Sequence, residues 1–306
     1  MINIDKLEPG IRTLVAQFIE AGRPSARQKS FEQRREEYLS SIDLAGETVP
    51  VWNISDRVID GLTFRIYKSS DQVNLPILIF YHGGCFVSGD LETHDRQLRQ
   101  IANESQSLVI AVDYRLAPEH VYPAAHDDAF KAAQIVHANA SAWGGDPDNI
   151  TIAGDSAGGH LALITCLRLK AQGQWMPRRQ ILVYPMLDAS GSSDSYQKNG
   201  DDYVITRDML LSGFEAYLSK LSFDHPEASP LYRDDFAGLP ETHILTAEFD
   251  PLVDEGEILY RRLLEAGVDA QCRRYLGVNH GFIQLGGISP AGRKAITDIA
   301  SIVNSD

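Results

Sequence analysis

The sequence contains only three cysteines, Cys85, Cys166 and Cys272, and they are far apart. An odd number without paired spacing argues against a disulfide framework and does not match the ligand pattern of a zinc site. We therefore expect free thiols, no bound metal and a reducing, cytoplasmic location.

Long apolar runs are also missing. The longest strongly apolar stretch, Leu75–Tyr81, is far shorter than the roughly 20 residues that a transmembrane helix needs. The first ten residues lack the basic start and the apolar run of a secretory signal. The sequence therefore predicts neither a transmembrane segment nor export.

Basic residues are scarce relative to acidic ones, 28 against 42, and the formal net charge is -14. Such a surface repels phosphate backbones, so nucleic acid is not an expected partner. In other respects the composition, 43% hydrophobic and 23% charged, is that of an ordinary globular protein. A chain of 306 residues can form one large domain with an insertion.

Short runs of β-branched and aliphatic residues alternate with helical patterns from about residue 49 onward. The expected strands are Leu62–Lys68, Ile77–Tyr81, Leu108–Asp113, Ile150–Ala153, Ile181–Tyr184, Ile244–Ala247 and Cys272–Leu276, and the expected helices include Asp128–Ala138, Ala157–Gln172 and Glu255–Ala266. Strands that alternate with helices indicate a mainly parallel sheet flanked by helices, an α/β fold.

Two segments lie outside this alternation. At the N-terminus, an amphipathic helix is predicted over Ile11–Ala21 and a charged helix over Phe31–Leu39. Later, the stretch Asp188–Asp202 is crowded with Ser, Gly, Asp and Asn and precedes a helix that Thr206 caps. A loop of this length often forms a lid or a binding loop, and a plain surface excursion is the alternative.

The candidate nucleophile is Ser156, in the G-x-S-x-G sequence Gly154-Asp155-Ser156-Ala157-Gly158. The bare pattern is weak evidence because chance supplies it often. Its position between an expected strand and an expected helix is what a nucleophile elbow requires, since small neighbours allow a strained turn to project the hydroxyl. A serine hydroxyl is a poor nucleophile, so the hypothesis also requires a histidine base, a carboxylate and donors for an oxyanion.

The candidate base is His280, which follows the last expected strand in a glycine-flanked loop. In α/β-hydrolases the chain order is serine, acid, histidine. Only His225 and His243 compete with it downstream of the helix that follows Ser156, and we expect both to be solvated.

The candidate acid is Asp250, at the end of the strand expected over Ile244–Ala247. Glu248, Asp254 and Glu255 are alternatives. We expect the last two to stabilise the N-terminus of the following helix through its dipole.

The sequence His82-Gly83-Gly84-Cys85 follows the strand at Ile77–Tyr81 and is the expected oxyanion loop. The backbone amides of Gly84, Cys85 and Ala157 are the predicted donors. His82 and Gly83 are expected to support the loop. Modification of the Cys85 thiol is hypothesised to slow turnover, with a tolerated small residue as the alternative.

These blocks together resemble the hormone-sensitive-lipase-like family of bacterial carboxylesterases, and most of all its acetyl esterases. The resemblance rests on His82-Gly83-Gly84, Gly89-Asp90, Thr93-His94-Asp95, Asp113 to Glu119, Gly154 to Gly159, Asp250-Pro251-Leu252 and His280-Gly281-Phe282. The family usually has a third glycine where this chain has Cys85.

The resemblance implies an α/β-hydrolase core, residues 46–187 and 222–306, under a helical cap formed by residues 1–45 and 188–221. It also implies a serine carboxylesterase that hydrolyses short-chain acyl esters through an acyl-enzyme, without metal or organic cofactor, and frequently a homodimer built along the last strand. An amidase or deacetylase with the same three residues is the alternative activity. A non-catalytic small-molecule binding protein is a further alternative, disfavoured because no member of the triad is missing.

Overall fold

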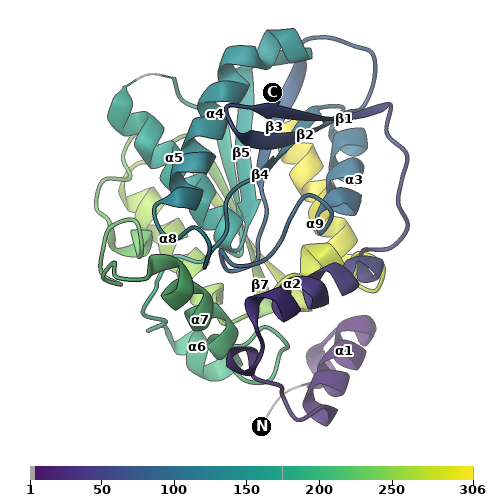
Figure 1. Ribbon diagram of the computed structural model, residues 1–306, viewed down its shortest axis with the longest axis vertical. Helices are drawn as coiled ribbons and strands as arrows, with labels where there is room; N and C mark the ends of the chain where they lie inside the picture. Colours follow the sequence, from purple (N-terminus) through teal and green to yellow (C-terminus); the bar gives the residue numbers. More distant parts are fainter. Residues whose placement is uncertain (1–3, 174, 306) are drawn as a thin grey trace.

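The computed structural model describes residues 4–173 and 175–305, and a twisted eight-stranded sheet forms its centre (Figure 1). The strand order is β1-β2-β4-β3-β5-β6-β7-β8. Strands β1 and β2 pair antiparallel, β2 pairs antiparallel with β4, and the other neighbours are parallel. The strands are β1 (Asn53–Ile59), β2 (Leu62–Lys68), β3 (Leu75–Tyr81), β4 (Leu108–Asp113), β5 (Gly145–Asp155), β6 (Arg179–Val183), β7 (Glu241–Phe249) and β8 (Ala270–Asn279).

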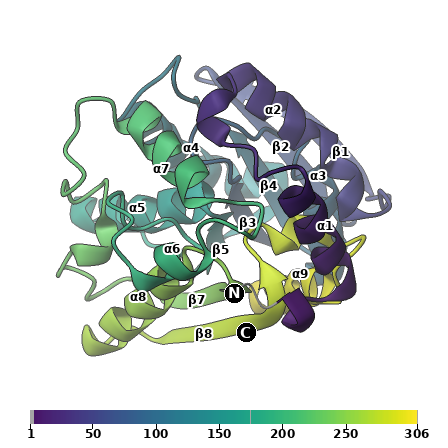
Figure 2. The same cartoon turned by 90° about the horizontal axis from the view of Figure 1, so that it is seen from below.

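Helices cover both faces of the sheet (Figures 1 and 2). One layer contains α3 (Asp95–Ser105) and α9 (Pro290–Val303), and the other contains α4 (Ala124–Trp143), α5 (Ala157–Gln172) and α8 (Val253–Glu265). Successive side chains of β3 serve both layers, since Ile77 and Ile79 pack in the cluster with α4 and α5 while Leu78 and Phe80 pack in the cluster with α9. Burial on both faces explains why the central strands are continuous apolar runs. Among the described residues, no helix combines the length and the apolar character needed to cross a lipid bilayer.

One strand and three α-helices of the described residues are absent from the sequence-based assignment. Strand β1 lies at the sheet edge and is largely exposed, so it shows no apolar alternation. Helix α6 (Asp194–Asn199) is only 6 residues long and lies inside the segment expected to be a loop. Helices α3 and α9 bury apolar residues at helical spacing, so their patterns were present in the sequence.

The N-terminal segment and the insertion after β6 lie together at the carboxyl end of the parallel strands (Figure 2). The N-terminal segment contains η1 (Ile4–Lys6), α1 (Pro9–Glu20), η2 (Ala26–Gln28), α2 (Phe31–Ser40) and η3 (Ile42–Ala45), and the insertion contains α6 and α7 (Arg207–Leu218). The expected cap of α7 is present, because Thr206 Oγ1 accepts the Met209 N–H at 3.2 Å. Two further short 3-10 helices are η4 (Pro230–Tyr232), after the insertion, and η5 (Phe282–Leu285), after β8.

Candidate active site

Ser156 occupies a sharp turn between β5 and α5. Its φ angle is +56°, a left-handed conformation that non-glycine residues rarely adopt. The turn requires glycine nearby, because a Cβ atom at Gly158 would lie 1.9 Å from the carbonyl oxygen of Tyr81. The strand, the strained turn and the helix therefore form the elbow that the motif predicts.

The structure brings His280 and Asp250 to this serine. His280 Nε2 lies 2.9 Å from Ser156 Oγ, and His280 Nδ1 lies 2.8 Å from Asp250 Oδ2. The second carboxylate oxygen of Asp250 accepts the Leu252 N–H at 2.7 Å. A carboxylate beside Nδ1 favours the tautomer that carries its proton there, which leaves Nε2 to accept the serine proton.

The competing histidines lie elsewhere. His243 bonds to Glu241 at 2.8 Å, and His225 Nδ1 accepts the Glu227 N–H at 3.1 Å. The expectation that His243 is solvated is wrong, because it lies in β7 and is only 9% exposed.

The competing carboxylates are occupied with structural contacts. Glu248 accepts the Gly277 N–H at 2.9 Å, and Asp254 accepts the Ser195 N–H at 2.8 Å. Glu255 is fully buried and accepts the backbone N–H groups of Leu187 and Asp188, and burial holds its pKa well above the ordinary value. Asp254 and Glu255 do occupy the first turn of α8, and they also fasten the start of the insertion to it.

The loop after β3 turns tightly beside Ser156. Gly84 has a φ angle of +124°, and a Cβ atom there would lie 2.0 Å from the Ser88 carbonyl oxygen. Within the described ranges, the backbone N–H groups of Gly84, Cys85 and Ala157 have no protein acceptor. Burial raises the pKa of the Cys85 thiol to about 12, so this thiol is protonated at neutral pH and a poor nucleophile.

His82 supports the same loop from behind. Its Nδ1 lies 2.8 Å from the Gly83 carbonyl oxygen, and its ring stacks on Tyr114 with centroids 4.2 Å apart. The Tyr114 hydroxyl donates to the His82 carbonyl at 2.5 Å. Burial lowers the pKa of His82 to about 4, so the ring is neutral at physiological pH.

Sequence reasoning missed the role of Asp155, the residue before the serine. Its buried carboxylate accepts the Gly83 N–H at 2.8 Å, lies 2.9 Å from His94 Nε2 and accepts from Gln284 at 3.0 Å. Burial alone would raise its pKa, but His94 and the Gly83 N–H hold the pKa below the ordinary value. Gln284 also donates to Tyr38 of α2. Asp155 lies within the motif and could have been singled out there. Nothing in the sequence indicates the link between Tyr38 and Gln284, which are 246 positions apart.

A cavity of about 330 Å³ opens above Ser156 and His280. Most of its wall comes from the N-terminal segment and the insertion, and the apolar residues are Leu14, Phe18, Pro24, Ala26, Leu44, Val87, Val204, Ile205, Met209 and Leu285. Four charged side chains also line it, those of Lys29, Arg34, Glu37 and Asp155. No group of three or more His, Cys, Asp or Glu side chains in residues 4–173 and 175–305 is arranged to hold a metal ion.

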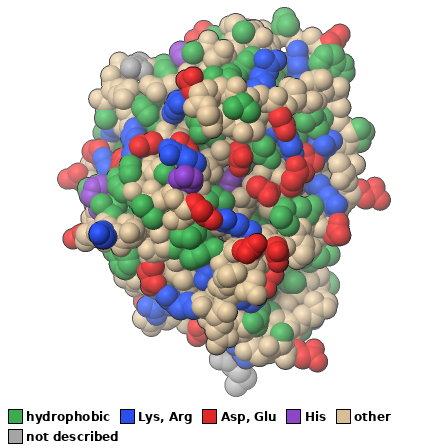
Figure 3. All heavy atoms as spheres, viewed as in Figure 1, with side chains coloured by type: hydrophobic (Ala, Val, Ile, Leu, Met, Phe, Trp, Pro, Cys, Tyr) green, Lys and Arg blue, Asp and Glu red, His purple; other side chains and the backbone are tan. Residues whose placement is uncertain are grey.

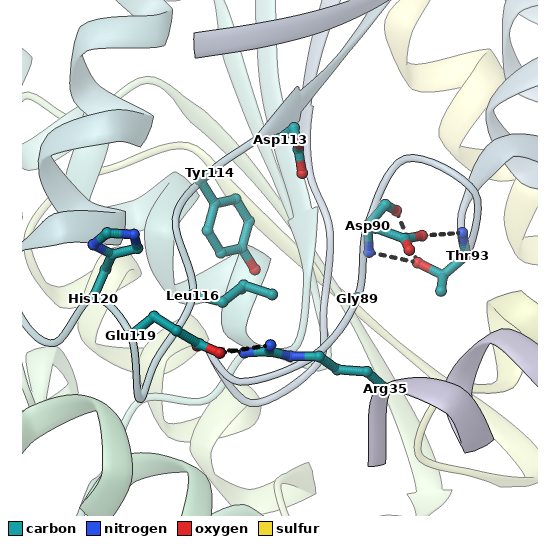
Figure 4. A pocket seen from close by; sticks show the side chains of 9 residues that line it. All are labelled: Arg35, Gly89, Asp90, Thr93, Asp113, Tyr114, Leu116, Glu119 and His120. Carbon is teal, nitrogen blue, oxygen red and sulfur yellow. Dashed lines mark hydrogen bonds and ion pairs between the residues drawn. The ribbon is translucent and has the colours of Figure 1, made fainter. Parts of the chain in front are cut away.

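A second hollow lies between the segment at residues 89–93, which follows β3, and the segment at residues 113–120, which follows β4 (Figure 4). Arg35 crosses it to pair with Glu119 at 2.7 Å and also donates to the Val87 and Ala117 carbonyls. Asp90 and Thr93 bond to each other along its edge (Figure 4). The surrounding face mixes acidic and basic side chains (Figure 3), so the net charge of -14 is not concentrated in one patch there. Arg35 therefore fastens α2 to the segment that contains Val87 and to the one that contains Ala117 and Glu119.

Comparisons with known proteins find α/β-hydrolases and esterases. The model of the family described as alpha/beta hydrolase fold matches residues 78–284. Carboxylesterase NlhH of Mycobacterium tuberculosis is 37% identical over 259 residues, 81% of each chain. Ethyl acetate hydrolase of Pseudomonas putida is 35% identical over 289 residues, 89% of this chain and 91% of that one. The solved structure of a Pyrobaculum calidifontis esterase superimposes with a TM-score of 0.91 at 37% identity and covers 97% of this chain and 98% of its own.

Proposed function

The chain belongs to the hormone-sensitive-lipase-like family of α/β-hydrolase carboxylesterases and is an ester hydrolase, and from this premise we propose a mechanism through Ser156, His280 and Asp250. The observation that carries the proposal is the continuous pair of contacts from Ser156 Oγ to His280 and from His280 to Asp250, at 2.9 and 2.8 Å. Nucleophile, base and orienting carboxylate within hydrogen-bond reach are what covalent catalysis requires.

In the first step, Ser156 Oγ attacks the ester carbonyl carbon while His280 Nε2 takes the hydroxyl proton. Asp250 orients the ring and stabilises its positive charge. The carbonyl oxygen becomes an oxyanion, which the free amides of Gly84, Cys85 and Ala157 stabilise. The carbon–oxygen bond to the alcohol then breaks, and His280 returns its proton to the departing alcohol.

In the second step, the acyl group is bound to Ser156 as an ester. His280 takes a proton from water, and the resulting hydroxide attacks the acyl carbon. A second oxyanion forms in the same site. Its collapse releases the carboxylic acid and returns the proton to Ser156.

The substrates we propose are small esters with short acyl chains, bound under a cap formed by residues 1–45 and 188–221 over a core of residues 46–187 and 222–306. Residues 1–3 lie outside the described part of the chain. A cavity of about 330 Å³ is at the small end of the range for ligand sites, which supports this choice. Its apolar wall suits an alkyl chain better than a polar one.

The test is a series of p-nitrophenyl esters from acetyl to palmitoyl, hydrolysed by the native protein and by Ser156→Ala. We expect the highest kcat/KM with a short acyl chain and at least about a 10⁴-fold loss of kcat in the variant. A palmitoyl optimum would contradict the substrate proposal. Full activity in Ser156→Ala would contradict the mechanism.

The alternative amidase or deacetylase activity uses the same three residues and differs in the leaving group. An ester and the amide of the same acid, assayed side by side, separate the two. We expect turnover of the ester to exceed that of the amide, and faster hydrolysis of the amide would favour the alternative.

We also propose that the protein forms a homodimer through β8 and acts in the cytoplasm. Strand β8 is at the edge of the sheet, and its Leu276 side chain is 68% exposed. An unpaired strand edge is a template for pairing with a second copy. The three cysteines are free, which fits a reducing compartment. Analytical ultracentrifugation and cell fractionation test these two points, and a monomer at micromolar concentration would contradict the first.

A further inference from the structure

Arg34 of α2 is a buried cation in the wall of the cavity above Ser156. Arg34 is only 8% exposed, yet it has no ion-pair partner among the described residues. Its Nε and Nη2 atoms donate to the same acceptor, the Ala26 carbonyl oxygen, at 3.0 and 2.7 Å. The third nitrogen, Nη1, is buried without a hydrogen-bond partner. A buried charge in this state is costly unless an anion compensates it.

The neighbouring carboxylates already have other partners. Glu37 accepts from Lys29 at 2.7 Å, and Asp208 pairs with Arg27. Asp155 is bonded to Gly83, His94 and Gln284. Of the two basic side chains Lys29 and Arg34 in the cavity wall, Lys29 has a carboxylate partner, and Arg34 has none among the described residues.

The next residue along α2 provides a comparison. Arg35 has a bidentate carboxylate partner, Glu119, and is partly exposed. Arg34 instead places its guanidinium over the Phe31 ring at 5.0 Å, and it lines the same cavity as Cys85 of the oxyanion loop. Burial lowers the pKa of Arg34, but arginine remains charged in proteins at neutral pH.

We propose that Arg34 is a specificity-determining residue that binds a carboxylate carried by the ester substrate, so that the substrates are esters of small acids or alcohols bearing an anionic group. The inference rests on the proposed function, because it assumes that an ester occupies this cavity. The substrate carboxylate supplies the missing counter-charge and accepts from the guanidinium, a charge-assisted contact that a neutral ester cannot make. The carboxylate belongs either to the acyl part or to the alcohol part.

Two pairs of esters test the proposal by pH-stat hydrolysis. In the acyl arm, monomethyl adipate is compared with the methyl ester of adipic acid monoamide. In the alcohol arm, 4-acetoxybutanoate is compared with 4-acetoxybutanamide. The members of a pair have nearly the same shape and differ in charge, so the acid-to-amide ratio of kcat/KM isolates the charge.

The ratio should exceed one in the native protein in the arm whose carboxylate reaches Arg34. Arg34→Gln should lower that ratio by about 10- to 100-fold, the range for a hydrogen bond to a charged group, and Arg34→Lys should restore part of it. Arg261→Gln removes an exposed charge on α8, outside the cavity, and is the matched control, with a ratio like that of the native protein.

A ratio that stays unchanged in Arg34→Gln, including one in which both rates fall together, would overturn the proposal. If Arg34→Gln does not fold, the native protein decides, because a ratio below one in both arms also overturns it. The proposed function fails in a different way, through absence of hydrolysis of all four esters and of p-nitrophenyl acetate.

Discussion

The floor and the roof of the cavity above Ser156 are held differently. The elbow at Ser156, the loop at residues 82–85 and the loop of His280 form the floor, which is held by buried hydrogen bonds. Its roof, formed by residues 4–45 and 188–221, combines buried apolar packing with ion pairs that water reaches. In the floor, Asp155 is 1% exposed and joins three elements. In the roof, Arg27 joins η2 to Asp208 and Glu215 of α7 with side chains 33 to 46% exposed.

The difference has a physical consequence. Buried polar contacts are strong and lose most when one partner is removed. Exposed ion pairs contribute about 0 to 1 kcal/mol and weaken in salt. We therefore expect the floor to keep the reacting groups in place while the roof can shift to admit esters of different shape.

The largest effect should follow removal of the Asp250 charge in the floor. Asp250→Asn favours the wrong His280 tautomer, and kcat for p-nitrophenyl acetate should fall by about 10⁴-fold. Asp254→Asn makes the same change of charge four residues later, where the carboxylate accepts the N–H of Ser195 in the roof insertion, and kcat should change less than about 3-fold. An equal loss of kcat in the two variants would mean that the contact between Asp250 and His280 is not what supports catalysis.

The next effect concerns packing under the elbow. In Gly158→Ala the new Cβ meets the backbone of Tyr81 and His82, which cannot move without disturbing β3. The free energy of unfolding should fall by about 3 kcal/mol in urea denaturation. In the control Gly286→Ala the nearest atom is 3.3 Å away, and a similar loss there would show that the elbow is not unusually tight.

An effect that is smaller for each side chain involved should appear with pH. Burial lowers the pKa of His82 and of His160 to about 4, and that of His126 well below its ordinary value of 6.5. Between pH 6.5 and 4 the unfolded chain binds protons on these rings and the folded chain does not, so their contribution to stability is complete above pH 6.5 and is lost as pH falls.

The slope should be roughly 1.4 kcal/mol per pH unit for each ring that stays neutral. Urea unfolding at pH 7, 6 and 5 measures it. A free energy that does not decrease over this range would mean that these histidines are protonated in the folded state.

The smallest effect should come from the roof. Arg27→Gln breaks the contacts to Asp208 and Glu215 and should reduce the free energy of unfolding by less than about 1 kcal/mol. The difference from the native protein should shrink between 0.05 and 1 M NaCl, since salt screens exposed charges. A loss of several kcal/mol that salt does not change would make the roof as tightly held as the floor.

Sequence patterns were most informative in the sheet and in the helix that follows Ser156. Strands β2 and β4 and helix α5 have the predicted bounds, because a strand buried on both faces and a helix that begins after a glycine-rich elbow leave strong local patterns. The prediction was weaker where partners are distant in the chain. Buried His243 was taken for a solvated residue, since its contact with Glu241 depends on the position of β7 in the sheet.

By itself, the sequence determined the α/β-hydrolase class and the three residues proposed to act together, because each of these residues directly follows a parallel strand and parallel strands end at one edge. Only the tertiary structure decided how the cavity is closed and charged. The link from Asp155 through Gln284 to Tyr38, and the burial of Arg34 without a counter-charge, arise from segments that meet after folding. Such contacts depend on packing geometry, and no local spacing in the chain records them.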